Sequence, residues 1–471
     1  MVKNTKFGVV VGHRGFFNSA LAIDGRKKIL NKLNKLGYEI TILPEHETPL
    51  GSVETIEDAK KYAKLFKEKS GEIDGIIVSL PNFGDELGIL NTIKLSNLNV
   101  PILIQASDDY IDKVDLKNRR DAFCGKLSVC NNFYQNKIPF TDTLEHTIDI
   151  DSEVFSKDIF FFEKVCRVVN RIKKARIGMI GTRPAAFQTM RFSEKILQDS
   201  GITVIPVDLS EIIFRALNLK DKDDFVQEQK KSLLEYGNIP KEITQNSILK
   251  QSKLSAAVNE WVEENSIDAL AVQCWESIQN NYGCAACATM SMLGERLIPS
   301  ACEADVAGAV SMYALTLASG KASALTDWNN NYGDDRSKCV VTHCSSYPKS
   351  FVGRKIEISN LDVLGESLGA ENCFGAIKGK VAKGSMTFFR MDTDDLNGRI
   401  RAYLGEGEFT DDPFDMAGGV AVCQINNLRN LMKYICKNGF EHHVGMVRSN
   451  CAEVIEHSMT NYFDWDIYRH S

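Results

Sequence analysis

Short apolar runs alternate with amphipathic segments along the first 110 residues. The runs at 7–11, 38–43, 75–79 and 101–105 predict strands, and the segments between them, such as 54–69 and 85–96, have helical spacing. Strands that alternate with helices predict a parallel, doubly wound sheet, whose ligands bind beyond the carboxyl ends of the strands. Arg14 follows the first run at such an end and is a candidate ligand-binding residue.

The same alternation begins again near residue 172. A long helical stretch, about 152–174, leads into an apolar run at 177–180, and helix 186–199, strand 202–205, further helices to 264 and strand 269–273 follow. Gln273 and Trp275 lie at the end of this last strand. The runs 298–302 and 322–326 place Glu303 and Asp327 at the next two strand ends, where side chains of a parallel sheet converge.

The pattern changes after residue 344. Short alternating strands separated by Gly, Asp and Asn occupy 374–381, 384–390 and 398–405, which is typical of an antiparallel sheet or small barrel. Two helices then flank a strand that begins at His442 and His443. The sequence therefore predicts an α/β protein with two doubly wound parallel-sheet domains of the Rossmann or flavodoxin type, residues 1–172 and 173–350. An α+β C-terminal domain, residues 351–471, follows them.

Length and composition agree with this division and exclude several functions. At ~150 residues per domain, 471 residues suggest three domains. The net charge is −6 with no basic cluster, which argues against nucleic acid or an anionic membrane as partner. We see no apolar signal region and no membrane-spanning run, so we expect a cytoplasmic protein. The thirteen cysteines are scattered and odd in number, as expected of free, reduced thiols.

Two carboxylates in an apolar neighbourhood are the main candidates for chemistry. Glu303 and Asp327 lie at the two ends of a helix rich in Ala, Gly and Ser. A carboxylate removed from water pairs with a cation or shifts its pKa, although helix and turn capping would also account for both acids. His443 or His442 could add a nitrogen, and two carboxylates with one imidazole suit a divalent cation such as Mn²⁺. His343 is a rival histidine, which we interpret as structural.

Four segments resemble, in order and rough separation, the active-site segments of the L-fucose isomerase family, which shares its fold with L-arabinose isomerase. They are Gln273-Cys274-Trp275, Cys302-Glu303-Ala304-Asp305, Leu325-Thr326-Asp327 and His442-His443-Val444-Gly445. The resemblance implies an aldose–ketose isomerase that uses Mn²⁺ or another divalent cation and forms an enediol. It implies that Glu303 and Asp327 are both metal ligands and catalytic proton carriers, that His443 is the third ligand, and that Arg14, Gln273 and Trp275 bind substrate.

The resemblance also implies a homo-oligomer, a trimer or hexamer, whose active sites are shared between subunits. This chain departs from the longer fucose isomerases in a shorter C-terminal half and in the sequence that follows Asp327. The substrate is therefore open among another hexose, a deoxy sugar, a pentose and an anionic sugar. A sugar-binding protein without catalysis on the same scaffold is the alternative function.

Overall fold

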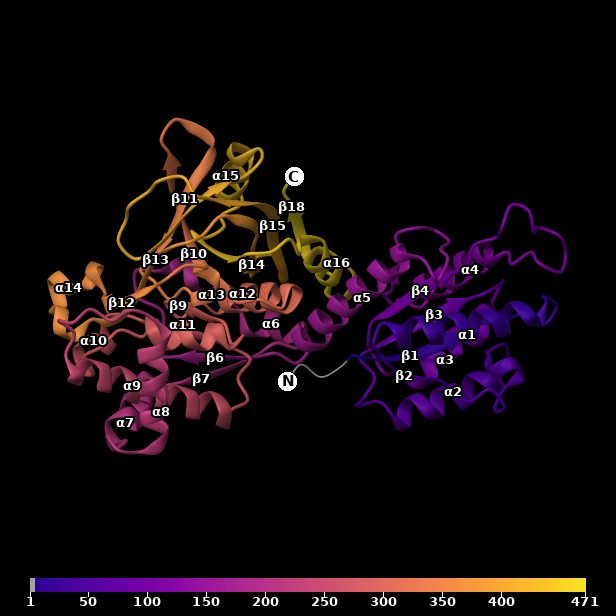
Figure 1. Ribbon diagram of the computed structural model, residues 1–471, viewed down its shortest axis with the longest axis horizontal. Helices are drawn as coiled ribbons and strands as arrows, with labels where there is room; N and C mark the ends of the chain where they lie inside the picture. The colour runs from indigo at the N-terminus through magenta and orange to yellow at the C-terminus, as the bar shows by residue number, and fades with distance from the viewer. Residues whose placement is uncertain (1–4) are drawn as a thin grey trace. The chain divides into compact units, whose positions relative to one another are not determined.

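The computed structural model describes residues 5–471 and divides the chain into two compact units, Met1–Asn170 and Arg171–Ser471 (Figure 1). Residues 1–4, which belong to the segment where we expected no signal region, lie outside the described residues. No helix among the described residues is both long and apolar enough to cross a membrane. All thirteen cysteines are described, and all are free thiols.

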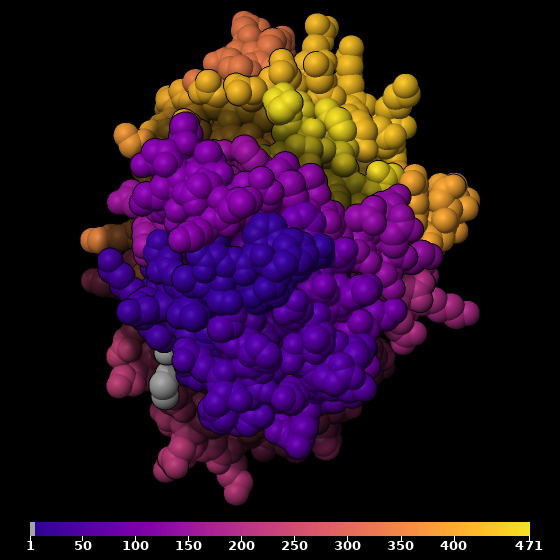
Figure 2. All heavy atoms as spheres, turned by 90° about the vertical axis from the view of Figure 1, so that its right-hand side faces the viewer, coloured from indigo at the N-terminus to yellow at the C-terminus, as the bar shows by residue number. Residues whose placement is uncertain are grey.

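The first unit is built on a five-stranded parallel sheet with the strand order β2-β1-β3-β4-β5. Successive residues of β1 alternate between two apolar cores, with Val10 in one and Val9 and Val11 in the other, so both faces of the sheet are covered. Segments from early and late in the unit appear together on the face that Figure 2 shows, coloured indigo to purple. The strands are β1 Lys6–Val11, β2 Glu39–Thr41, β3 Gly75–Leu80, β4 Ile102–Ala106 and β5 Thr141–Asp142; the helices are α1 Ser19–Lys35, α2 Ile56–Glu68, α3 Glu86–Ser96, α4 Ala122–Gln135 and α5 Glu153–Ile172, with the 3-10 turn η1 Pro49–Gly51.

The second unit begins with a four-stranded parallel sheet in the order β7-β6-β8-β9. Its strands are β6 Arg176–Ile180, β7 Thr203–Val207, β8 Ala269–Val272 and β9 Ser300–Cys302; its helices are α6 Glu194–Asp199, α7 Leu209–Asn218, α8 Asp224–Tyr236, α9 Gln245–Glu264, α10 Ser277–Asn281, α11 Cys287–Glu295 and α12 Val306–Ser319, with the 3-10 turn η2 Gln188–Met190. The helix expected at 186–199 is wrong in its first half. Residues 181–193 are mostly loop, and α6 begins only after Ser193, whose hydroxyl caps it.

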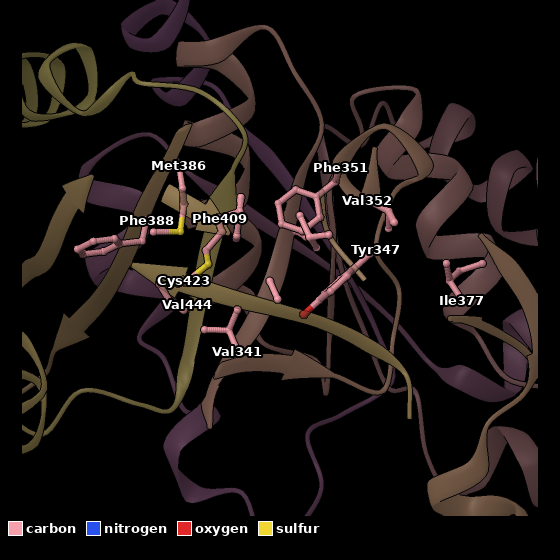
Figure 3. Close-up of a cluster of buried hydrophobic side chains, with 14 of the residues drawn as sticks. Val341, Tyr347, Phe351, Val352, Ile377, Met386, Phe388, Phe409, Cys423 and Val444 are labelled. Carbon is pink, nitrogen blue, oxygen red and sulfur yellow. The ribbon is translucent and has the colours of Figure 1, made fainter. Parts of the chain in front are cut away.

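Six antiparallel strands of the same unit close into a small barrel. They follow each other as β16-β11-β10-β17-β14-β15, and β15 pairs back with β16. Met386, Phe388, Phe409, Cys423 and Val444 come from four of these strands and form part of one buried cluster (Figure 3). The strands are β10 Ser323–Tyr332, β11 Asp335–His343, β14 Gly384–Asp394, β15 Arg399–Thr410, β16 Gly419–Gln424 and β17 His443–Val447; β12 Glu357–Asn360, β13 Phe374–Lys380 and β18 Asp466–Arg469 extend the sheet, and the helices are α13 Lys349–Val352, α14 Asp362–Leu368, α15 Leu428–Lys437 and α16 Ala452–Phe463, with η3 Ala370–Asn372.

The predicted fold class is confirmed, with two parallel sheets followed by a largely antiparallel one. The expected place of Asp327 is wrong, because it lies within β10 of the barrel instead of at the end of a parallel strand. The polar run after Asp327 has no apolar alternation, yet it forms the exposed half of the β10–β11 hairpin. The boundary at residue 350 stays a prediction about domains, although a cut there would separate β11 from its neighbour β16.

Helix α12 lies between the two layers of the second unit. It contacts β8 and β9 of the parallel sheet and β14 and β17 of the barrel. Small residues make this possible: a Cβ added at Gly445 of β17 would lie only 3.1 Å from Leu315 of α12. The carboxyl end of the parallel sheet and one face of the barrel therefore meet around the start of α12.

Candidate active site

Glu303 owes its position to a tight turn between β9 and α12. Glu303 and Ala304 both have left-handed backbone conformations, with φ of 62° and 53°. Such conformations cost non-glycine residues about 1–3 kcal/mol each and persist only where the surroundings enforce them. The Ala304 N–H donates to the carbonyl of Val272 at 3.0 Å, which fixes the turn to the neighbouring strand. The carboxylate of Glu303 is thereby held at the edge of the sheet, with only 6% of the residue exposed.

Strand register brings Asp327 and His443 together. They are directly opposite each other in the antiparallel pair of β10 and β17. Their neighbours Trp328 and Val444 pack in or against the barrel core, and successive side chains of a strand point to opposite faces. Asp327 and His443 therefore both point out of the barrel, toward the layer that carries Glu303.

Three unpartnered atoms meet at this point. The Nε2 atom of His443 lies 3.5 Å from Oε2 of Glu303 and 3.4 Å from Oδ1 of Asp327. All three atoms are buried, and none has a hydrogen-bond partner. Each such buried atom costs about 1–3 kcal/mol if nothing satisfies it. Two carboxylate oxygens and one imidazole nitrogen are the donor types that suit a cation such as Mn²⁺. Glu303 and Asp327 nevertheless fall in two separate groups around His443, because the oxygens of the two carboxylates do not lie within 4.8 Å of each other as well as of the histidine nitrogen.

The indole of Trp275 holds the other oxygen of Glu303. Its Nε1–H donates to Oε1 of Glu303 at 3.2 Å, which leaves Oε2 directed at the metal position. Burial raises the pKa of the Glu303 carboxyl, and His443 only partly opposes this. A raised pKa suits a carboxyl group that accepts and returns a proton near neutral pH.

A buried charge network orients the imidazole of His443. Its Nδ1 lies 2.8 Å from Oδ2 of Asp305, and a carboxylate only accepts, so Nδ1 carries the proton and Nε2 keeps its lone pair. Arg390, fully buried, donates to both oxygens of Asp305 and through Nε to Glu441 at 3.0 Å. Burial alone would raise the pKa of Asp305, but Arg390 and His443 lower it well below its usual value. Burial raises the pKa of Glu441 to about 7.

The sequence analysis did not identify this network as functional. Asp305 belongs to one of the segments that carry the family resemblance. An acid at the start of a helix is typically a cap, and Asp305 does cap α12 by accepting from the Gly308 N–H. Its sequence context therefore gave no separate sign of a role in the site. Arg390 lies 85 residues further along the chain and has no local signal.

Two further predicted residues have structural partners. Gln273 accepts a hydrogen bond from the Thr182 N–H at 3.0 Å and donates to Ser277 at 3.3 Å. Arg14 belongs to the first unit, where it pairs with Glu86 and lies over the ring of Phe83 at 4.3 Å. Contact of either residue with a substrate stays a prediction.

Two other histidines lie near the three ligand atoms. His442 groups with Glu303 and His443, but it is exposed. His343, at the end of β11, groups with Asp327 and His443, one atom from each lying within 4.8 Å of the others. It is 2% exposed, and its Nε2 has no hydrogen-bond partner. The structure thus brings into the site a histidine that the sequence led us to interpret as structural.

We expect Asp305→Asn to weaken Mn²⁺ binding by about 10- to 100-fold. The amide preserves the shape of the cap but removes the charge that makes the His443 ring a better ligand. Calorimetric titration of the metal-stripped protein measures the affinity, and thermal unfolding verifies the fold. Asp392→Asn is the matched control, since Asp392 is 7% exposed and pairs with Arg401 at 2.9 Å, and no hydrogen bond or ion pair joins it to His443 in residues 5–471. Equal Mn²⁺ affinity in the folded Asp305→Asn protein and the wild type would contradict the assigned role.

Known proteins resemble the chain at both ends. Residues 8–173 match the family described as fucose/sulfoquinovose isomerase, N-terminal domain, and residues 341–470 match L-fucose isomerase, C-terminal domain. A sulfoquinovose isomerase of Alkalicoccus urumqiensis is 27% identical over 297 residues, which cover 62% of this chain and 64% of that protein, slightly less than two thirds of its length. A sulfoquinovose isomerase of Priestia aryabhattai is 22% identical over 389 residues, 82% of this chain and 83% of that protein.

A solved solute-binding protein of Burkholderia multivorans is 9% identical and covers 68% of this chain and 95% of its own, but its TM-score of 0.19 carries no argument. The C-terminal match includes His443, whereas Glu303 and Asp327 lie between the two matched stretches. The chain belongs to the fucose/sulfoquinovose isomerase family, a family of aldose–ketose isomerases.

Proposed function

We propose that this protein is a divalent-metal-dependent aldose–ketose isomerase that works through an enediol. The observation that carries the proposal is that two buried, unpartnered carboxylate oxygens, Glu303 Oε2 and Asp327 Oδ1, each lie within 3.5 Å of the unpartnered Nε2 of His443. These residues would hold the cation. Mn²⁺ is our proposed ion, because two oxygens with one nitrogen suit a hard-to-borderline metal.

The reaction moves a proton between C1 and C2 of an open-chain sugar. A bound cation would polarise the carbonyl and hydroxyl oxygens and stabilise the negative charge of the enediolate. Glu303 suits the role of base, because Trp275 fixes one of its oxygens and burial raises its pKa. The side chain of Asp327 is 30% exposed, so it can face the substrate while one oxygen points at the metal position.

We expect activity to disappear when the cation is removed and to return with Mn²⁺. Glu303→Gln and Asp327→Asn should each lower kcat by at least ~10²-fold, the low end for a lost acid or base. Reaction in D₂O should place deuterium at the carbon that receives the proton. Elemental analysis must accompany the assay. Full turnover after proven metal loss would contradict metal dependence, and metal-free binding of an unreacted sugar would support the alternative, a sugar-binding protein.

We further propose an anionic sugar of the sulfoquinovose type as substrate. The named relatives are sulfoquinovose isomerases, and sulfoquinovose is a hexose with a sulfonate group. The loop after β6 contains two arginines and contacts the site through Phe187, which packs on Trp275 and His442 with ring centroids 5.4 and 5.8 Å apart. Arg183 and Arg191 of this loop donate only to loop carbonyls, with no carboxylate recorded beside them in residues 5–471. A planar guanidinium suits a sulfonate well.

This proposal predicts a preference that depends on charge. We expect kcat/KM for sulfoquinovose to exceed kcat/KM for glucose. Arg183→Gln or Arg191→Gln should reduce kcat/KM for sulfoquinovose by at least ~10-fold, because one charged hydrogen bond contributes about 1.5–3 kcal/mol. Either substitution should have little effect on any turnover of neutral sugars. Arg215→Gln is a control, because Arg215 pairs with Glu211 and Glu264 on the surface. Faster turnover of glucose, L-fucose or a pentose than of sulfoquinovose would contradict the proposal.

We also propose that the active site is shared between subunits. The three candidate ligands all belong to the second unit, and the first unit has no equivalent acid–histidine group among its described residues. Arg14 lies at the carboxyl end of β1, the edge where parallel sheets present binding groups. A domain without its own chemistry can supply specificity to a neighbouring subunit.

Subunit mixing tests this proposal. Arg14→Ala should mainly raise KM, whereas Glu303→Gln should lower kcat. After subunit exchange between these two variants, we expect activity above the sum of the separate samples, because some sites then combine an intact Arg14 with an intact Glu303. A fully active monomer in light scattering, or no recovery after proven exchange, would contradict it.

A further inference from the structure

Two buried histidines at the site differ in what faces their Nδ1 atoms. For His443 the neighbour is the carboxylate of Asp305, which can only accept. For His343 it is the backbone N–H of Cys344, at 2.9 Å, which can only donate. The thiol of Cys344 also lies 3.5 Å from the same nitrogen. The two rings are therefore in opposite hydrogen-bonding environments although their centroids are only 5.6 Å apart.

These partners decide which nitrogen carries the proton. His443 is protonated at Nδ1 and offers a lone pair at Nε2, as a metal ligand must. His343 accepts at Nδ1 and therefore carries its proton at Nε2. To bind a cation through Nε2, His343 would have to move that proton to Nδ1, where it would face the Cys344 N–H and leave a part-buried amide without a partner. Such a loss costs about 1–3 kcal/mol.

The Nε2–H of His343 is a buried donor without an acceptor. The residue is 2% exposed, and its Nε2 makes no geometrically acceptable hydrogen bond in residues 5–471, although the Cys302 thiol is a further neighbour of the ring. One of its ring nitrogens lies within 4.8 Å of a ligand atom from each of Asp327 and His443. A donor held beside a metal position can receive an oxygen that arrives with the substrate.

We propose that His343 is a further catalytic residue, which donates a hydrogen bond from Nε2 to the substrate oxygen that becomes negatively charged, and that it does not bind the metal. This inference rests on the proposed isomerase function. The donor is fixed in advance by the strand end and by Cys344. Prearranged donors of this kind contribute about 10²–10³ in kcat.

The test compares His343→Gln and His343→Leu with His443→Gln. Glutamine keeps an N–H at about the position of Nε2, whereas leucine fills the space without a donor. We expect both His343 variants to bind Co²⁺ within about twofold of wild type and with the same visible absorption spectrum, which reports the ligands. His443→Gln should lose Co²⁺ affinity at least tenfold. We expect kcat to fall at least ~10²-fold in His343→Leu and to recover in part in His343→Gln.

Two results would overturn the inference. The first is a His343→Gln protein that loses Co²⁺ affinity and changes its spectrum as His443→Gln does, since His343 would then be a ligand. The second is a folded His343→Leu protein with the kcat of wild type. If the leucine variant does not fold, the ¹⁵N chemical shifts of histidine-labelled wild type test the inference instead. The His343 signals are assigned as those that are missing in His343→Gln. A protonated Nε2 supports the inference, and a protonated Nδ1 overturns it. Wild type that binds Co²⁺ but turns over no sugar would refute the proposed isomerase function, while the Co²⁺ spectra would still decide between donor and ligand.

Discussion

The buried carboxylate of Asp305 is the contact on which the geometry of the site depends. It caps α12 through the Gly308 N–H, accepts from His443 of β17 and pairs with Arg390 of β14. One side chain thus links the end of the parallel sheet to two barrel strands. Breaking one partner out of a buried charge pair costs about 3–5 kcal/mol, so the link tolerates little change. Glycine is required at 308, since a Cβ there would lie 2.3 Å from Oδ2 of Asp305.

Three different features of the fold bring Glu303 and Asp327 next to His443. The left-handed backbone at 303–304 directs the side chain of Glu303, the strand register places Asp327 opposite His443, and the charge network orients the imidazole ring of His443. Register is the strictest of them, because a slip of one residue between β10 and β17 would send Asp327 or His443 into the barrel core. The site is therefore specified by the fold as a whole and not by a local motif.

The sequence predicted the alternation of strands and helices, because apolar periodicity reports which faces are buried. It also predicted Glu303, Asp327 and His443 as one group. In the structure each of the two carboxylates has an oxygen within 3.5 Å of the Nε2 of His443, and the group and its roles stay predictions. It missed the β10–β11 hairpin, since Asn329, Asn330 and Asn331 are solvent-exposed strand residues with no apolar alternation. The sequence pattern also could not predict the ion pair of Asp305 with Arg390, because only tertiary packing brings together residues so far apart in the chain.

The two histidines of this site, His343 and His443, have the same side chain but differ in chemical role because their hydrogen-bond partners differ. Glu303, Asp327, His343 and His443 each leave one buried polar atom unsatisfied, and such a concentration of unmet polar atoms is unusual for a folded interior. Three of these atoms are acceptors, two carboxylate oxygens that each lie within 3.5 Å of one imidazole nitrogen, and a cation can satisfy acceptors of this kind. The fourth, on His343, is a donor by virtue of the Cys344 amide at its other nitrogen, and a cation cannot satisfy it. An oxygen must reach it, so the unmet groups together call for a cation and an oxygen-bearing ligand side by side, which is the composition of a metal-bound sugar.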